Sequence, residues 1–336
     1  MKSLLFLGTS SGAGKTTLDA AFCRYLARSG KKVAPFKGSN LSLNSYVTLG
    51  GEEIGMGQAF QAWACGIEPT GDMNPVLLKP AGSGRMQIIL RGKPHMDIVR
   101  DQPWDRDAVM EKACESYDRL LEQYDAVICE GSGSPAELNL MSTDMANVGL
   151  MKARRVNSIL VGDIERGGVF AAIYGTWLLI PDDLKPLMKG FVINRFRGDA
   201  SILGSGIERI EKLTGMRCYG IVPYETLKFP EEDSLSQTGG NIGSGDLHEE
   251  FVRNLDTLID NAIAAGVDFE GIAKLLEDRS SAGGDLDGLD CHAVLDGRIH
   301  GNGPAVDEEK ERIGKGTRRA NGLLYGHTGL YAVLFA

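Results

Sequence analysis

The chain has 336 residues, 43% of them hydrophobic and 24% charged, which is ordinary for a folded globular protein. Its 36 Lys and Arg against 45 Asp and Glu give a net charge of −9, which argues against nucleic acid or an anionic membrane as the main partner. Six cysteines without a CxxC pair exclude a zinc ribbon and a disulfide scaffold, and predict a reduced, cytoplasmic location. Its apolar runs are shorter than the ~18 residues that a membrane-spanning helix needs.

Short apolar runs alternate with helical patterns along the first two thirds of the chain. The expected strands are residues 2–7, 32–36, 125–129, 158–161, 190–193 and 218–222, and the clearest helices are 16–29 and 106–123. This alternation predicts an α/β fold with a doubly wound, mostly parallel sheet. Ligands bind such a sheet at the carboxyl ends of its strands, which here carry Gly8, Lys37, Glu130, Asp163 and Asn194.

The composition changes near residue 236, and this change predicts the domain organisation. We expect one domain over residues 1–235 and a glycine-rich linker over 236–247. Residues 248–278 then read as two helices, a short helical appendage, and residues 279–336 as an irregular tail. Residues 280–303 of this tail contain few apolar residues, whereas residues 323–335 are apolar.

A glycine-rich segment, GTSSGAGKTT at residues 8–17, joins the first strand to the first helix. Its backbone N–H groups and the helix N-terminus suit phosphate oxygens, Lys15 suits the β and γ phosphates, and the Thr16 hydroxyl suits Mg²⁺. The strict pattern has Gly where Thr9 stands, so this is a variant of the P-loop. The sequence predicts a P-loop NTPase-like site for ATP and Mg²⁺, with the nucleotide bound by Gly12, Ala13, Gly14, Lys15, Thr16 and Thr17.

Phosphoryl transfer also needs carboxylates that hold the metal and a cation for the moving phosphate. Glu130 follows a buried strand and is a candidate metal ligand with Thr16. Glu53 is a second candidate, and Glu52 beside it is the control; either candidate could equally be a surface acid. Lys37 ends the strand beside the first one, so we predict that it is catalytic with Lys15, although an exposed Lys is the alternative.

Two more strand ends carry side chains that could act on the nucleotide. Asp163 either assists catalysis at the metal or caps the following helix. Asn194 can both donate to and accept from adenine, so we predict that it selects the base, with an Asx turn as the alternative.

Seven segments within residues 1–235 together resemble the cobyric acid synthase family of cobalamin biosynthesis. They are GTSSGAGKTT, PFKGSNLSLNSYVT, GEEIGMGQAFQAWACGIEPTGDMNPVLLKP, ICEGSGSPAELNL, VGDIERGGVFAAIYGT, GFVINRFRGD and GIVPY. The run EPTGDMNPVLLKP separates this family from its relatives dethiobiotin synthetase and cobyrinic acid diamide synthase. The resemblance implies a dethiobiotin synthetase-like domain that uses ATP to activate a carboxylate as an acyl phosphate, which ammonia then attacks. The implied reaction converts adenosylcobyrinic acid a,c-diamide, a corrinoid, to adenosylcobyric acid.

The sequence departs from the family pattern in two places. Ser39 and Leu41 stand where the family usually has Gln and Met, which is expected to change contacts with the corrinoid. The family also carries a C-terminal class I glutaminase whose nucleophilic Cys sits in a glycine-flanked elbow. No Cys of this sequence lies in such an elbow, and Cys291 lies in LDCH. We therefore expect the glutaminase to be missing or truncated, with free ammonia or a separate glutaminase as the nitrogen source.

Two other functions stay open alongside an amide ligase. One is a catalytically incomplete remnant that keeps the ATP site. The other is a P-loop ATPase switch module, which would be expected to carry a second Lys early in the loop, where this chain has Ser10 and Ser11. A homodimer also stays open, because the sequence does not determine the oligomeric state.

Overall fold

The computed structural model describes residues 2–82, 84–99, 103–225 and 247–278. Its centre is a six-stranded parallel sheet with the strand order β12-β11-β10-β1-β9-β2. The strands are β1 (Ser3–Gly8), β2 (Val33–Phe36), β9 (Ala126–Glu130), β10 (Asn157–Asp163), β11 (Met188–Phe196) and β12 (Arg217–Pro223). The predicted α/β class and parallel sheet are confirmed. The expectation that the strand before Lys37 lies beside the first strand was wrong, because β9 lies between β1 and β2 and pairs with both.

Alternation along β1 explains the three-layer arrangement, because successive side chains of a strand point to opposite faces. Leu4 and Phe6 belong to one hydrophobic cluster, and Leu5 and Leu7 to another. The first face is covered by α1 (Lys15–Arg28), α2 (Met56–Ala64), α7 (Leu247–Ala264) and α8 (Phe269–Lys274). The second is covered by α3 (Arg106–Gln123), α4 (Val148–Arg154), α5 (Val169–Leu179) and α6 (Gly204–Thr214). Short 3₁₀ turns span Met141–Thr143, Lys185–Leu187 and Ala200–Leu203.

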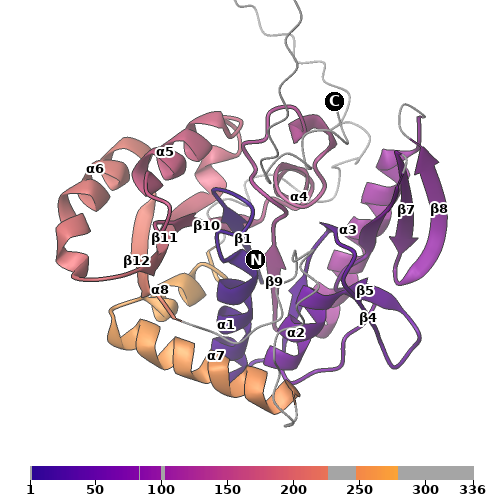
Figure 1. Cartoon of the computed structure of the whole chain (residues 1–336), viewed down its shortest axis with the longest axis horizontal. Coiled ribbons are helices and arrows are strands. Elements are labelled where there is room, and N and C mark those ends of the chain that lie inside the picture. The colour runs from indigo at the N-terminus through magenta and orange to yellow at the C-terminus, as the bar shows by residue number, and fades with distance from the viewer. Residues whose placement is uncertain (1, 83, 100–102, 226–246, 279–336) are drawn as a thin grey trace, which may run out of the picture.

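A second sheet, which the sequence did not predict, lies between β2 and α3 in the chain. It has the order β3-β6-β7-β8, formed by β3 (Ser39–Leu41), β6 (Val76–Gly82), β7 (Arg85–Leu90) and β8 (Lys93–Val99), and a hairpin pairs β4 (Ser45–Val47) with β5 (Glu53–Gly55). Its apolar face, including Val76 and Ile88, packs against Val109 and Ala113 of α3. Because α3 also covers the main sheet, this helix joins the two sheets (Figure 1).

The helices α7 and α8 lie where the sequence predicts two helices, and they pack into the main core. Figure 1 shows α7 running along the lower edge of the molecule, beneath α1 and α2. Phe251 of α7 contacts Phe60 of α2 with ring centroids 4.9 Å apart, and Arg24 of α1 pairs with Asp256 of α7 at 2.8 Å. The predicted tail (279–336) and all of the predicted linker but its last residue lie outside the described residues. Within the described ranges, no helix combines the length and hydropathy needed to cross a bilayer.

Candidate active site at the phosphate loop

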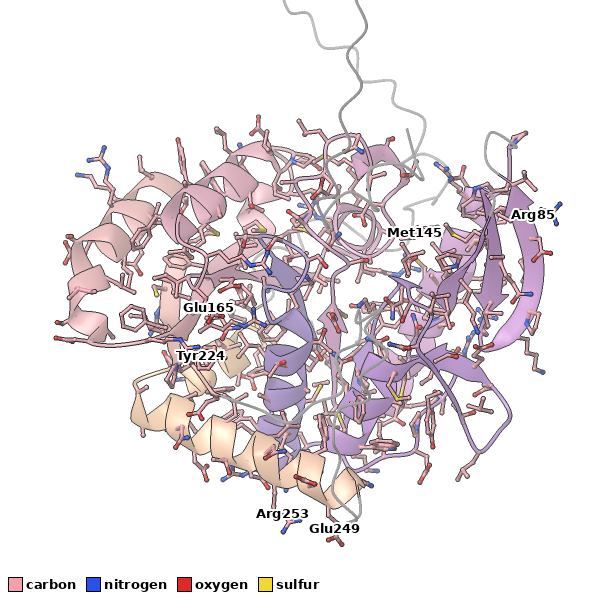
Figure 2. All side chains as sticks on the ribbon, in the orientation of Figure 1. Arg85, Met145, Glu165, Tyr224, Glu249 and Arg253 are labelled. Carbon is pink, nitrogen blue, oxygen red and sulfur yellow. The ribbon has the colours of Figure 1, made fainter. Side chains whose placement is uncertain are left out.

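A cleft of about 1060 Å³ opens at the carboxyl edge of the main sheet. It reaches from the phosphate loop toward β12 on one side and toward the second sheet on the other. In Figure 2, Glu165 and Tyr224 of its lining lie on the β10–β12 side and Met145 lies toward β7 and β8. Leu41 and Leu78 line it from the second sheet. A cleft of this size is at the upper end of the ~300–1,000 Å³ range of small-molecule binding sites.

Two glycines of the phosphate loop allow close approach by neighbouring side chains. Gly14 has φ +92°, and a Cβ there would lie 2.1 Å from Nδ2 of Asn194. Lys15 lies across Gly8, where a Cβ would come within 2.8 Å of the lysine side chain. The Lys15 ammonium donates to the carbonyl oxygens of Ser10 and Gly133, at 3.1 and 2.9 Å. The lysine is thus held over the loop, where the sequence predicts that it meets phosphates.

The Glu130 carboxylate, only 1% exposed, is the centre of the polar cluster beside this loop. Its Oε1 accepts from the Thr16 hydroxyl at 2.7 Å and from the Lys37 ammonium at 3.1 Å. Its Oε2 accepts from the side-chain amides of Gln61 at 2.7 Å and Gln58 at 3.3 Å. The structure therefore brings together three residues singled out from the sequence, Thr16, Lys37 and Glu130.

The surroundings of Glu130 keep this buried acid ionised. Burial alone would raise the pKa of its carboxyl group, but the charges of Lys37 and Lys15 and the hydrogen bonds from Thr16 and Gln61 outweigh it. The pKa of Glu130 consequently lies below its ordinary value. An ionised carboxylate beside a Thr hydroxyl is an oxygen-rich environment that suits a hard cation.

The segment that carries EPTGDMNP holds the backbone of Lys37. The Lys37 N–H donates to the Met73 carbonyl at 2.8 Å, and the Asn74 amide donates to the Lys37 carbonyl at 3.0 Å. Asn74, which is fully buried, also accepts from the Gly55 N–H at 2.9 Å. Residues of the specific motif therefore position the candidate catalytic lysine.

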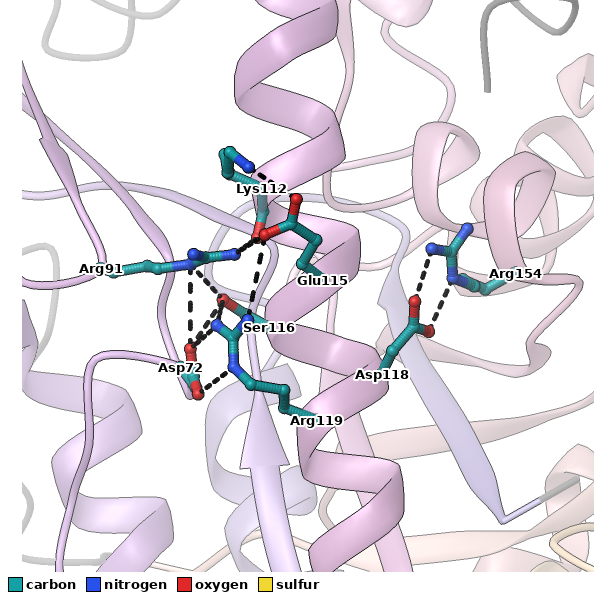
Figure 3. Close-up of polar contacts among 8 residues, drawn as sticks. All are labelled: Asp72, Arg91, Lys112, Glu115, Ser116, Asp118, Arg119 and Arg154. Atoms are coloured by element: carbon teal, nitrogen blue, oxygen red, sulfur yellow. Dashed lines mark hydrogen bonds and ion pairs between the residues drawn. The ribbon is translucent and has the colours of Figure 1, made fainter. Parts of the chain in front are cut away.

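A charged network that includes side chains of α3 anchors the EPTGDMNP segment at Asp72, the residue before Met73 (Figure 3). Asp72 accepts from the Arg119 guanidinium, with Nε 2.9 Å away, and from the Ser116 hydroxyl at 2.8 Å. Arg91 donates to Ser116 at 3.1 Å and to Glu115 at 2.5 Å. Burial alone would raise the pKa of Asp72, but the bonds from Arg119 and Ser116 and the two guanidinium charges lower it. This network fixes the Lys37-holding segment against α3.

Two predicted site residues lie apart from the Glu130 cluster. Glu53 accepts from the Ser45 hydroxyl at 2.5 Å and pairs with Lys79, and it is absent from the described residues that line the cleft. Asp163 accepts from the Glu165 N–H at 2.9 Å and from Arg195 at 3.0 Å, and it is likewise absent from that lining. A metal role for Glu53 and a catalytic role for Asp163 stay predictions.

Asn194 lies at the phosphate loop and contacts its backbone. Its Nδ2 donates to the Ala13 carbonyl at 2.9 Å, and its Oδ1 accepts from the Arg195 N–H at 2.9 Å. The side chain thus supports the loop around Gly14. Selection of adenine by this amide stays a prediction.

The oxygen donors around Glu130 suit a Mg²⁺ ion that phosphates and water also bind. They do not form a site in which protein side chains alone would hold a metal. The part of the chain that the structure describes contains no group of three or more His, Cys, Asp and Glu side chains that could hold a metal. Mg²⁺ commonly takes one or two protein oxygens and completes its shell with phosphates and water. Thr16 and Glu130 provide such oxygens next to the phosphate loop.

Gln58 and Gln61 are site residues that the sequence analysis missed. They lie three positions apart on α2, and both are fully buried. A signal was present, because two polar residues on one face of an otherwise apolar helix call for polar partners. The partner itself, Glu130, could not be read from the helix.

Residues 4–235 match the family described as the CobQ/CobB/MinD/ParA nucleotide binding domain. The chain belongs to this family. Relatives of this nucleotide-binding domain include the probable cobyric acid synthases of Methanosphaerula palustris and Archaeoglobus fulgidus. The first is 45% identical over 295 residues, covering 86% of this chain and 58% of that protein. The second is 50% identical over 238 residues, covering 70% and 51%. The predicted resemblance to cobyric acid synthases is confirmed, although the chain spans only about half the length of these curated relatives.

Solved structures also resemble this nucleotide-binding domain. One is the septum site-determining protein MinD of Pyrococcus horikoshii, complexed with Mg-ADP, at 13% identity and a TM-score of 0.41. The match covers 85% of this chain and 99% of that one.

Proposed function

We propose that this chain is an ATP-dependent amide synthetase that acts on side-chain carboxylates of a corrinoid in cobalamin biosynthesis. The proposed reaction converts adenosylcobyrinic acid a,c-diamide to adenosylcobyric acid in the cytoplasm. The observation that carries this proposal is the continuity of the cleft, in which the phosphate loop and the buried Lys37–Glu130 pair open toward the second sheet. The similarity to probable cobyric acid synthases supports the choice of substrate.

In the proposed mechanism, a carboxylate oxygen of the corrinoid attacks the γ-phosphorus of ATP. The bond between this phosphorus and the oxygen bridging to ADP breaks, giving ADP and an acyl phosphate. Ammonia then attacks the acyl carbon, the carbon–oxygen bond to phosphate breaks, and the nitrogen loses a proton. The products are an amide and inorganic phosphate, and nothing is oxidised or reduced.

The residues of this chain act mainly on the first step. Lys15 meets the charge of the β and γ phosphates, and Lys37 stabilises the phosphoryl group as it moves to the acceptor. Thr16 and Glu130 would hold Mg²⁺, which when bound neutralises phosphate charge and orients the phosphates. The apolar lining from Leu41 and Leu78 suits the bulk of a corrinoid.

The nitrogen is proposed to arrive as free ammonia or from a glutaminase. Burial raises the pKa of the thiols of Cys23 and Cys129 well above their ordinary value, which disfavours a thiolate nucleophile at either position. Cys291 lies outside the described residues. Because NH₃ and not NH₄⁺ is the nucleophile, turnover with ammonium should rise as the pH increases.

The test uses the purified chain with ATP, MgCl₂ and adenosylcobyrinic acid a,c-diamide, and with either ammonium or glutamine. We expect ADP formation that depends on the corrinoid, and amidated corrinoid detected by mass spectrometry, with ammonium but not with glutamine. The Lys15→Ala variant is the control that should lose both signals. ADP release that does not respond to the corrinoid would favour an ATPase switch, and nucleotide binding without turnover would favour a remnant. Glutamate released from glutamine, and lost in Cys291→Ser, would overturn the nitrogen assignment.

A further inference from the structure

Two buried glutamines hold the side of Glu130 that faces away from the phosphate loop. Gln61 donates to Oε2 at 2.7 Å and Gln58 donates to the same oxygen at 3.3 Å. Both glutamines are fully buried, and their spacing of three places them on one face of α2. Neither of them has been given a role in the reaction proposed above.

Four donors surround the Glu130 carboxylate, two at each oxygen. An ionised carboxylate offers about four lone-pair positions, two on each oxygen. Thr16 and Lys37 donate to Oε1, while Gln58 and Gln61 donate to Oε2. The two oxygens therefore have different partners: the hydroxyl and the ammonium donate to Oε1, and the two glutamine amides donate to Oε2. The glutamines therefore determine which carboxylate oxygen is presented to the phosphate loop.

The glutamine amides are themselves fixed in orientation. Gln58 Nε2 also donates to Gln61 Oε1 at 3.3 Å, and Gln58 Oε1 accepts from the Asn40 amide at 3.4 Å. This chain of amides runs from Asn40, which lines the cleft, to Glu130. A side chain that donates and accepts within such a chain cannot rotate without losing several bonds.

The opposite face of α2 is packed rigidly, which gives the glutamines a firm support. Phe60 contacts Phe251 of α7 at a centroid distance of 4.9 Å, and Trp63 contacts Phe60 at 5.1 Å. Trp63 also meets Tyr46 of the β4–β5 hairpin at 5.5 Å. Groups that orient a ligand are most effective when their own rotamers are locked by packing.

We propose that Gln58 and Gln61 are positioning residues for the Mg²⁺–nucleotide complex. They hold the Glu130 carboxylate so that Oε1 faces Thr16 and the phosphate loop, and they act through Glu130 without touching the nucleotide. The proposal concerns nucleotide binding and does not depend on which acceptor the enzyme amidates. Its test therefore gives the same answer whether or not the chain carries out the corrinoid reaction.

A purely structural role makes a different prediction from a positioning role. If the glutamines only fill space in the core, a methionine of similar size should replace either of them with little effect on the ligand. If they orient Glu130, the same replacement should weaken binding by about 10-fold or more, the range typical of groups that orient a metal ligand. The effect should also vanish when Glu130 can no longer present a carboxylate.

The experiment measures binding of a non-hydrolysable ATP analogue by calorimetry, with Mg²⁺ and with EDTA, for the full chain. The variants are Gln61→Met, Gln58→Met, Glu130→Gln and the double variant Gln61→Met/Glu130→Gln. Gln87→Met on β7, at a half-buried glutamine in the second sheet, is the control substitution of the same type. Circular dichroism and thermal melting monitor the fold of every variant.

We expect Gln61→Met to weaken Mg²⁺-dependent binding about 10-fold or more and binding in EDTA by much less. Gln58→Met, which loses the longer bond, should act in the same direction but more weakly. The double variant should bind no worse than Glu130→Gln alone, because the two positions form one unit. Additive losses, or equal losses with and without Mg²⁺, would overturn the proposal. If Glu130→Gln does not fold, unchanged Mg²⁺-dependent binding in both single methionine variants would overturn it equally well.

Discussion

Lys37 and Glu130 form a buried ion pair that joins neighbouring strands at the edge of the cleft. Lys37 directly follows β2 and Glu130 ends β9, and their Nζ and Oε1 atoms are 3.1 Å apart. The two side chains are only 6% and 1% exposed. Because two buried charges lose their hydration, a pair like this adds little net stability, and its presence at a strand edge beside the phosphate loop favours a functional reason.

Removing the Lys37 charge should slow turnover more than it weakens substrate binding. A cation that meets the phosphoryl group mainly in the transition state contributes to kcat, so we expect Lys37→Ala to lower kcat by about 10²-fold or more with a smaller rise in the KM for ATP. Steady-state kinetics measures both terms, and Lys37→Arg is the charge-retaining control. A higher KM with an unchanged kcat would make Lys37 a simple binding residue. Circular dichroism should accompany the assay, because the variant leaves Glu130 buried without Lys37.

Asn194→Ala should reduce the preference of the site for ATP over GTP. The amide lies at the loop, where it donates to the Ala13 carbonyl, and its remaining hydrogen-bonding capacity can discriminate between bases. Competition binding with ATP and GTP measures the ratio of the two affinities. Equal losses for both nucleotides would show that the amide only supports the loop.

Asp72→Asn should reduce the extent to which the free energy of unfolding falls at low pH. The pKa of Asp72 is lower in the folded chain than in the unfolded one, so the ionised group stabilises the fold above its unfolded pKa of about 3.9. This stabilisation is lost as the pH falls through the lower, folded pKa. The free energy of unfolding of the wild type should therefore fall more steeply than that of the variant below about pH 4, as denaturant titrations at several pH values would measure. Glu115→Gln is the comparison. Hydrogen bonds from Lys112 and Arg91 lower the pKa of Glu115 to about 2, but its side chain is 38% exposed, and solvent should weaken its effect.

Phe251→Ala should destabilise the whole nucleotide-binding domain. The side chain is 5% exposed and packs against Phe60, so its loss leaves a cavity between α7 and α2 that costs about 3–5 kcal/mol. Ile263→Ala, on the same helix but 47% exposed, should change stability by only about 0.5 kcal/mol. Chemical unfolding of both variants makes the comparison. Similar small effects would mean that α7 is not part of the cooperative core.

The main sheet could be predicted because its strands are buried on both faces and read as uninterrupted apolar runs. Every residue of β9 is buried, for example, and the run ends at Glu130. The second sheet gave a weaker signal, because its apolar runs are shorter, as at the start of β6. β3 has only three residues, and β8 alternates exposed with half-buried positions that a loop would also tolerate. Its strands are defined by pairing with each other and by packing against α3, which are tertiary effects.

Some residues of the candidate site could be predicted from their positions at strand ends, and others could not. Lys37 and Glu130 could be placed together because parallel strands end at the same edge of a sheet. Glu53 was selected by local sequence, but the β4–β5 hairpin places it with Lys79 and Ser45. Gln58 and Gln61 were missed because their partner lies about 70 positions away, and a single sequence does not encode such a contact locally.

The hydrogen bonds that meet at Glu130 also constrain when the site can form during folding. Thr16 is 114 positions from Glu130 along the chain, and Lys37 is 93 positions away. β9 must insert between β1 and β2 before either bond exists, so the ribosome must have released well over a third of the chain before the phosphate loop has its acidic partner. Topologies dominated by such distant pairings fold slowly, because the entropy cost of closing the long loops comes before the stabilising contacts form. A nascent chain that stops short of β9 would carry an intact phosphate-loop sequence without the Glu130 carboxylate beside it.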